Sequence, residues 1–137
     1  MKLSAGMIYE LRFRVPPSKL VPALYPESAE FQDMPPVFAT GYLVGLIEWA
    51  CMKAVKPHLT VGTHIDVSHT APTPAGLEVR VTVSLIQVDG RRLVFEVEAH
   101  DGVDLISKGS HERFLIDRAR FGERVHLKQQ SHIGDLS

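Results

Sequence analysis

The chain has 137 residues, of which 45% are apolar and 23% are charged, and its formal charge at neutral pH is −1. This length allows one domain, or one domain with a tail, and the composition is that of a globular protein rather than a disordered or collagen-like chain. Because Lys and Arg nearly balance Asp and Glu, the overall charge gives no reason to expect nucleic acid or an anionic membrane as a partner.

The only cysteine, Cys51, excludes an intramolecular disulfide and a zinc site built from several thiolates. The histidines show no ligand spacing such as HExxH, and the sequence contains no nucleotide-binding loop or nucleophile elbow. We therefore expect neither a metal nor a cofactor. The single cysteine favours a reducing compartment, and we expect a cytoplasmic protein. The N-terminus has no long apolar run before Glu10, so that we expect no signal peptide.

The first two segments differ in character. Residues 7–15 alternate apolar and charged side chains, which predicts a half-buried strand that ends at Pro16. Residues 18–36 are rich in proline but contain several large apolar side chains, and we expect a packed, irregular loop that acts as a lid.

Residues 37–55 read VFATGYLVGLIEWACMKAV, with Thr40, Glu48 and Lys53 as the polar positions. A helix that is apolar on all sides is a buried one, and we expect this helix in the centre of the fold. Its longest run without a charge, residues 35–47, is shorter than the roughly 20 residues that a bilayer requires, which argues against a membrane span.

Alternating apolar residues predict further strands over residues 63–70, 77–85, 93–99 and 103–116. Asp-Gly pairs separate the last three of these segments, which predicts hairpins. A strand, one buried helix and then an antiparallel meander make the chain α+β. A curved antiparallel sheet wrapped around one central helix satisfies this order, and that arrangement is the hotdog fold.

We place this domain over residues 1–117 and a polar C-terminal extension over residues 118–137. The last dozen residues of the extension are expected to be frayed. No internal repeat or low-complexity run indicates a second domain.

Two polar side chains in the expected central helix need an explanation, since burying an unpaired carboxylate is costly. Helical geometry places Thr40 and Glu48 about 80° apart around the axis and about 12 Å apart along it. His69 shares its strand face with Ile65 and Val67, and we expect it to point toward the helix. A histidine opposite a glutamate can work as an acid/base pair, and a satisfied structural pair is the alternative.

Thr40 lies in the first turn of the expected helix, where backbone N–H groups lack intrahelical acceptors and can hold a developing oxyanion. An ordinary first-turn threonine is the alternative. Arg91 and Arg92 follow an Asp-Gly turn and can meet the phosphates of a substrate, or they are solvated surface charges.

Several blocks of the sequence occur together in a recognisable order: VPPSK, LYPES, PPVFATGYLVGLIEWACMKAV, GTHIDVSHTAPTPAG, GRRLVFEVEAHDGVD and GSHERFLI. Together they resemble the fluoroacetyl-CoA thioesterase group of hotdog proteins. The resemblance extends from about Phe13 to Ile116, which is most of the chain.

The resemblance implies a homodimer that hydrolyses an acyl-CoA thioester with Thr40, Glu48 and His69 as its catalytic set. It also implies that Gly62 and Arg113 contribute to the substrate site. Under this hypothesis Thr40 or Glu48 attacks the thioester carbonyl, or Glu48 activates a water molecule. His69 then acts as general base and protonates the departing thiolate, while Arg113 stabilises a nearby carboxylate.

The lid departs from the family at one position. The family carries a phenylalanine six residues before its catalytic threonine, where this chain has Met34, whereas Phe31 nearby is retained. Methionine fills space differently from an aromatic ring. The substrate can therefore carry a fluoroacetyl group or another small or medium acyl chain, aliphatic or aromatic. A second hypothesis is a hotdog protein that binds acyl-CoA or a small ligand without cleaving it.

Overall fold

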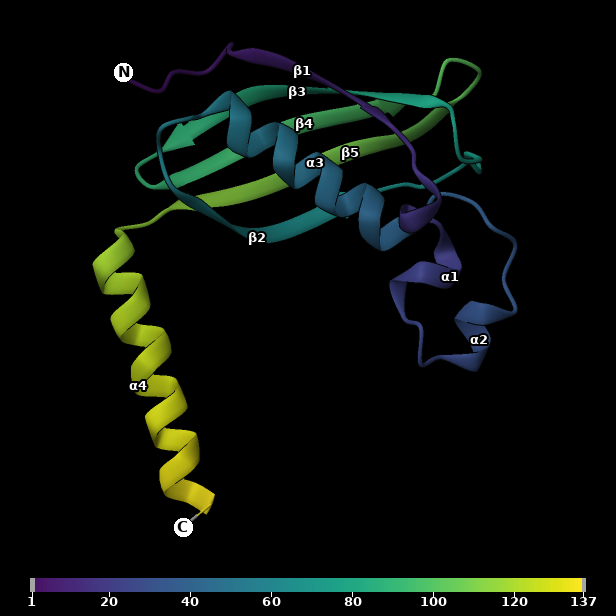
Figure 1. Cartoon of the computed structure of the whole chain (residues 1–137). Helices are drawn as coiled ribbons and strands as arrows, with labels where there is room; N and C mark the ends of the chain where they lie inside the picture. The colour runs from purple at the N-terminus through teal and green to yellow at the C-terminus, as the bar shows by residue number, and fades with distance from the viewer. Residues whose placement is uncertain (1, 137) are drawn as a thin grey trace.

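The computed structural model of the chain describes residues 2–136, with side chains up to residue 132. The strands are β1 (Ile8–Arg14), β2 (Thr60–Val67), β3 (Glu78–Asp89), β4 (Arg92–His100) and β5 (Leu105–Leu115). The helices are η1 (Pro17–Lys19), α1 (Val21–Leu24), α2 (Ala29–Gln32), α3 (Thr40–Ala54) and α4 (Arg118–Leu136). The strands form one sheet in the order β1-β3-β4-β5-β2, and every neighbouring pair is antiparallel (Figure 1). The predicted α+β hotdog architecture is therefore confirmed.

The two predicted hairpins form where the Asp-Gly pairs occur. Asp89 pairs with Arg92, so that the first turn consists of Gly90 and Arg91, with Gly90 at a φ of 60°. The second turn is organised by Asp101, whose Oδ1 accepts the backbone N–H groups of Val103 and Asp104 at 2.9 and 2.7 Å. Both turns follow from local chemistry, which is why the sequence pattern located them.

Helix α3 lies across one face of the sheet and supplies the centre of the core. Leu43, Ile47 and Cys51, spaced four residues apart on one side of the helix, are fully buried together with Val81 and Phe95 of the sheet. Burial raises the pKa of the Cys51 thiol to about 12 because the thiolate would lose its hydration. Cys51 is therefore a packing residue.

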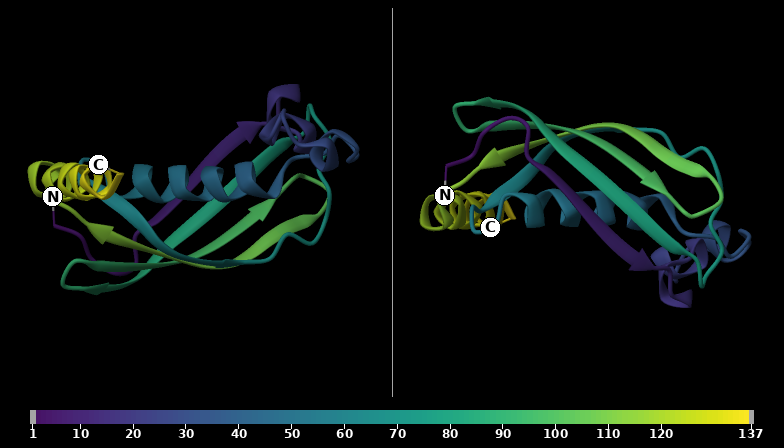
Figure 2. Two further views of the ribbon diagram at one scale, coloured as in Figure 1. Left: turned by 90° about the horizontal axis from the view of Figure 1, so that it is seen from below. Right: turned by 90° about the horizontal axis from the view of Figure 1, so that it is seen from above.

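The opposite side of α3 is exposed, and the expectation that this helix is buried on all sides is wrong for the single chain. Trp49 and Met52 are 44% and 41% exposed, and Gly45 is exposed as well. Both views of Figure 2 show the reason, which is that the curved sheet covers the helix from one side only. Helix α3 therefore has more apolar side chains than the single chain buries.

The predicted lid is not an irregular loop but contains the three short helices η1, α1 and α2. These helices lie beyond the N-terminal end of α3 (Figure 1). Ser28 caps α2 by accepting the backbone N–H of Phe31 at its Oγ, at 3.1 Å. Pro22 lies in the first turn of α1, where a missing N–H costs nothing.

The C-terminal extension forms a helix whose backbone is described as far as Leu136, and the fraying of its last dozen residues stays a prediction. Asp117 caps this helix by accepting the N–H of Arg120 at its Oδ1, at 3.0 Å, and the helix contains no proline. Helix α4 extends away from the sheet (Figure 1), and the boundary at residue 117 stays a prediction. Among the helices described, none combines the length and apolarity needed to cross a membrane.

Candidate active site

Thr40 and His69 form a hydrogen-bonded pair at the N-terminal end of α3. His69 follows the end of β2, and the residues before and after it are hydrogen-bonded to β5. The N–H of Ser68 donates to the carbonyl of Lys108 at 3.0 Å, and that of Thr70 donates to the carbonyl of Ile106 at 2.9 Å. Between these anchors, the Nδ1 of His69 lies 2.7 Å from the Oγ1 of Thr40.

The environment of His69 favours its neutral form. Desolvation lowers the pKa of the imidazole, because the charged form would lose hydration. Its Nε2 is buried and has no hydrogen-bond partner among the described residues. A neutral imidazole at hydrogen-bond distance from a hydroxyl can accept the proton of that hydroxyl, so that this pair can generate a nucleophile.

The backbone at the start of α3 offers free donors beside this pair. The first helical hydrogen bond runs from Leu43 to the carbonyl of Ala39, and Ala39 provides no side-chain cap. Within the described residues, the N–H groups of Thr40, Gly41 and Tyr42 have no acceptor. Such donors at a helix N-terminus can stabilise an oxyanion, as expected from the position of Thr40.

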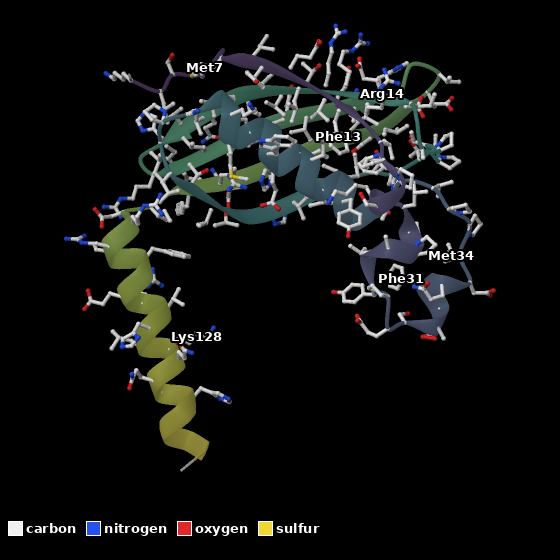
Figure 3. All side chains as sticks on the ribbon, in the orientation of Figure 1. Met7, Phe13, Arg14, Phe31, Met34 and Lys128 are labelled. Carbon is white, nitrogen blue, oxygen red and sulfur yellow. The ribbon has the colours of Figure 1, made fainter. Side chains whose placement is uncertain are left out.

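A cavity of about 430 Å³ opens between this end of α3 and the lid. Phe31 and Met34 of the lid line it together with Thr40. Figure 3 shows Phe31 and Met34 in the part of the lid that carries α2. The structure thus brings both lid residues singled out in the sequence to the cavity that contains Thr40.

A second polar cluster lies further along α3, around Glu48. The Nη1 of Arg113 donates to the Oε2 of Glu48 at 2.9 Å, and the side chains of the two residues are 3% and 36% exposed. Arg113 also donates from Nε to the hydroxyl of Thr60 at 2.8 Å and from Nη2 to its carbonyl at 2.9 Å. The buried guanidinium is therefore fixed in place and holds one oxygen of a half-buried carboxylate.

His111 and Gly62 complete this cluster. The Nη1 of Arg113 lies 3.1 Å from the Nε2 of His111, whose Nδ1 lies 2.7 Å from the carbonyl of His64. Since the guanidinium can only donate, His111 accepts at Nε2 and donates from Nδ1. Desolvation lowers the pKa of His111, which favours the neutral form of the imidazole. A Cβ at Gly62 would lie 2.7 Å from the Oε2 of Glu48, so that only glycine leaves room for the carboxylate.

The structure corrects three expectations about these residues. In the single chain Thr40 is exposed, at the first residue of α3, and Glu48 is half-buried. His69 contacts Thr40 rather than facing Glu48, which pairs with Arg113 instead. Ile65 is exposed, so that it does not share the core-facing position expected for it, whereas Val67 packs against the core.

Thr60 and His111 were not identified in the sequence. One signal was available, since His111 precedes Arg113 by two residues on β5 and therefore shares its face of the sheet. The expectation that Arg113 stabilises a carboxylate agrees with its contact to Glu48. No group of three His, Cys, Asp or Glu side chains is arranged for a metal in the part of the chain that the structure describes.

Comparison with known proteins identifies similar chains. A model of the family described as fluoroacetyl-CoA-specific thioesterase matches residues 24–119. The fluoroacetyl-CoA thioesterase of Streptantibioticus cattleyicolor is 54% identical over 121 residues, which are 85% of this chain and 87% of that protein. A solved structure of the fluoroacetyl-CoA thioesterase FlK has a TM-score of 0.90 at 50% identity, covering 93% of this chain and 98% of that chain. A thioesterase superfamily member from Thermus thermophilus has a TM-score of 0.82 at 25% identity, covering 96% and 98%.

Proposed function

The chain belongs to the fluoroacetyl-CoA-specific thioesterase family, and on that premise we propose that it hydrolyses a small acyl-CoA with Thr40, Glu48 and His69 as its catalytic residues. The protein is a thioester hydrolase. The observation that carries the catalytic assignment is the 2.7 Å contact between the Thr40 hydroxyl and His69, at the mouth of an apolar cavity. This is the arrangement of a nucleophile and its base.

In the first step, the Thr40 oxygen attacks the carbonyl carbon of the thioester and its proton passes to the Nδ1 of His69. The free N–H groups at the start of α3 stabilise the oxyanion that forms on the carbonyl oxygen. The carbon–sulfur bond then breaks, and His69 returns the proton to the departing CoA thiolate. This step leaves the acyl group as an ester on Thr40.

In the second step, Glu48 accepts a proton from a water molecule that attacks this ester. Glu48 passes this proton to the Thr40 oxygen as the ester bond breaks, and the acid is released. Arg113 orients the Glu48 carboxylate by holding its Oε2, and the second oxygen remains available to the water.

We propose that two copies of the chain bring these groups together. Thr40 and Glu48 lie about 12 Å apart along α3, too far for one small substrate to touch both. The exposed side of α3 presents Gly45, Trp49 and Met52, and β2 is an edge strand that pairs with β5 on one side only. A two-fold axis passing near Val44 would cover these surfaces and place Thr40 opposite Glu48 of the partner subunit.

Met34 sets the acyl preference in this proposal. The lid cavity is lined by Val21, Leu24 and Phe31 as well as Met34 and has room for a small apolar acyl group. A flexible thioether adapts to more shapes than an aromatic ring. We expect hydrolysis of fluoroacetyl-CoA together with turnover of other small acyl-CoAs. A cytoplasmic location stays a prediction that rests on the single cysteine.

The test is the release of free CoA thiol from a panel that includes acetyl-CoA and fluoroacetyl-CoA. The wild type is expected to release thiol, whereas His69→Ala and Glu48→Gln are expected to lose at least about a hundredfold in turnover. Circular dichroism confirms that the variants fold. A folded wild type that binds acyl-CoA without releasing thiol would contradict the proposal and favour a binding protein, and so would full turnover by either variant.

A further inference from the structure

A second cavity, of about 230 Å³, lies where the turn between β3 and β4 meets the start of α4. Its lining residues are Arg91, Ile116, Asp117, Arg120, Phe121 and Arg124. The lid cavity and the Glu48 cluster share no residue with it. Arg91 belongs to the arginine pair noted in the sequence, of which Arg92 is engaged in an ion pair with Glu112.

The lining of this cavity, which we call the arginine cavity, is strongly positive. Three arginines and one aspartate line it, and Asp117 already accepts the backbone N–H of Arg120. Among the described residues, no carboxylate lies within ion-pair distance of Arg91, Arg120 or Arg124. Arginines that line one cavity without a carboxylate partner are available to an anion, and their planar donors match phosphate oxygens.

The rest of the lining is apolar. Ile116 and Phe121 contribute side chains, and the Phe121 ring is 37% exposed. An accessible aromatic ring offers a flat surface against which a nucleobase can stack. Phosphate-binding arginines beside such a ring match the chemistry of a phosphorylated nucleoside better than that of a lone inorganic anion.

The arginine cavity lies within reach of the Glu48 cluster. Ile116 follows β5 directly, three residues after Arg113, which contacts Glu48. Three residues of extended chain span about 10 Å. The pantetheine arm of CoA runs over about thirteen bonds between its sulfur and the nearest phosphorus, and an extended chain of that length reaches roughly 15 Å. A thioester beside Glu48 can therefore place its phosphates at this cavity.

We propose that the arginine cavity binds the phosphorylated nucleotide end of the acyl-CoA. Arg91, Arg120 and Arg124 hold the phosphates, and Phe121 lies against the adenine. This inference rests on the proposed function, since it supplies a binding site for the leaving group of the same reaction. The arginine cavity then increases the affinity for the substrate, whereas the groups around Thr40 and Glu48 break the thioester bond.

The test compares acyl-CoA with the matching acyl-pantetheine, which lacks the nucleotide. In Arg120→Gln/Arg124→Gln, KM for acyl-CoA is expected to rise about tenfold while kcat stays within about twofold. For acyl-pantetheine, kcat/KM is expected to equal that of the wild type. The matched control is Lys128→Gln, since Lys128 lies one turn beyond Arg124 on α4, outside the cavity (Figure 3). This control is expected to leave both substrates unaffected.

Adenosine 3′,5′-bisphosphate serves as a probe that does not depend on turnover. It is expected to bind the wild type in a calorimetric titration and to bind the double variant about tenfold more weakly. An unchanged KM for acyl-CoA, equal losses on both thioesters, or equal binding of the probe by wild type and variant would overturn the inference. If the wild type hydrolysed neither thioester, the proposed function would fail, while the probe titration would still decide the role of the cavity.

Discussion

At the scale of single residues, the half-buried His69 and the buried His111 have different partners. His111 is satisfied at both nitrogens, by Arg113 and by the carbonyl of His64. His69 has a hydroxyl at Nδ1 and a buried, unpartnered Nε2 within the described residues. A fully bonded imidazole holds its neighbours in place, whereas one with a single hydroxyl partner can change its protonation during a reaction. The structure therefore favours His69 over His111 as the base.

The shifted pKa of His69 predicts the acid limb of the pH profile. Since desolvation lowers that pKa, His69 stays neutral to a lower pH than a free histidine with its value of 6.5. As the pH is lowered, we expect kcat/KM to decrease with a midpoint below pH 6.5. Between pH 6.5 and neutral pH, we expect kcat/KM to be constant. Steady-state rates of thiol release between pH 4.5 and 8 measure this limb. A midpoint above pH 6.5 would show that another group limits the rate or that His69 is stabilised in its charged form.

Gly62 provides a second prediction at this scale. In Gly62→Ala the new Cβ would meet the Oε2 of Glu48 at 2.7 Å, and the flexible glutamate can move away more easily than the backbone. We expect a loss of roughly tenfold to a hundredfold in kcat/KM with little change in melting temperature. The control is Gly122→Ala, since a Cβ at Gly122 meets nothing within 4 Å. Wild-type kinetics in folded Gly62→Ala would contradict the role assigned to the Glu48 position.

At the scale of elements, a chain of contacts fixes the start of α3. Asp101 lies in the turn between β4 and β5, and its Oδ2 accepts a hydrogen bond from the hydroxyl of Thr73 at 2.8 Å. Thr73 lies in the segment between β2 and β3. The carbonyl of Thr73 accepts the N–H of Phe38 at 2.7 Å, two residues before Thr40. Asp101 and Thr73 are both buried. We infer that this turn positions the nucleophile without touching the substrate.

The variant Asp101→Asn tests whether the Asp101 carboxylate stabilises this turn. Burial raises the pKa of Asp101, but the N–H groups of Asp104 and Val103 and the Thr73 hydroxyl outweigh it, and the pKa lies below its ordinary 3.8. The stability that the carboxylate contributes is thus present above that ordinary value and is lost as the pH falls below it. We expect Asp101→Asn to lower the free energy of unfolding by about 1–2 kcal/mol at pH 7. The difference from wild type should shrink near pH 3.

Urea denaturation at both pH values measures this effect, with Asp104→Asn as the control because no hydrogen bond to its side chain is found within the described residues. A difference between Asp101→Asn and wild type that is independent of pH would show that the carboxylate charge is not what stabilises the turn.

The elements differ in how far the sequence predicts them. Strands β3 and β4 and their turns follow from alternation and Asp-Gly pairs, which are local signals. The exposed side of α3 could not be predicted, since the helix is apolar on both sides and its pattern does not distinguish the side that the sheet covers. Helix α4 was missed because its residues are mostly polar, which favoured a frayed tail over a helix. Of the site, the pairing of Arg113 with a carboxylate was anticipated, while Thr60 and His111 required the register of β2 and β5.

At the scale of the whole molecule, the proposed mechanism requires the two polar clusters to meet. One chain holds the Thr40–His69 pair at one end of α3 and the Glu48–Arg113 cluster at its middle. The uncovered side of α3 exposes Trp49 and Met52. Pairing two copies across this side would remove the exposed apolar surface and complete two catalytic sites at once.

The most direct measurement is the thiol-release activity of His69→Ala and Glu48→Gln co-expressed in one cell, compared with each variant alone. In a shared arrangement, a mixed dimer holds one site with a wild-type His69 and a wild-type Glu48. Half of the dimers are mixed in a random population, so that about a quarter of wild-type activity is expected to return. Native mass spectrometry verifies that mixed dimers form. Mixed dimers with no more activity than the separate variants would contradict the proposal that the two subunits share the catalytic site.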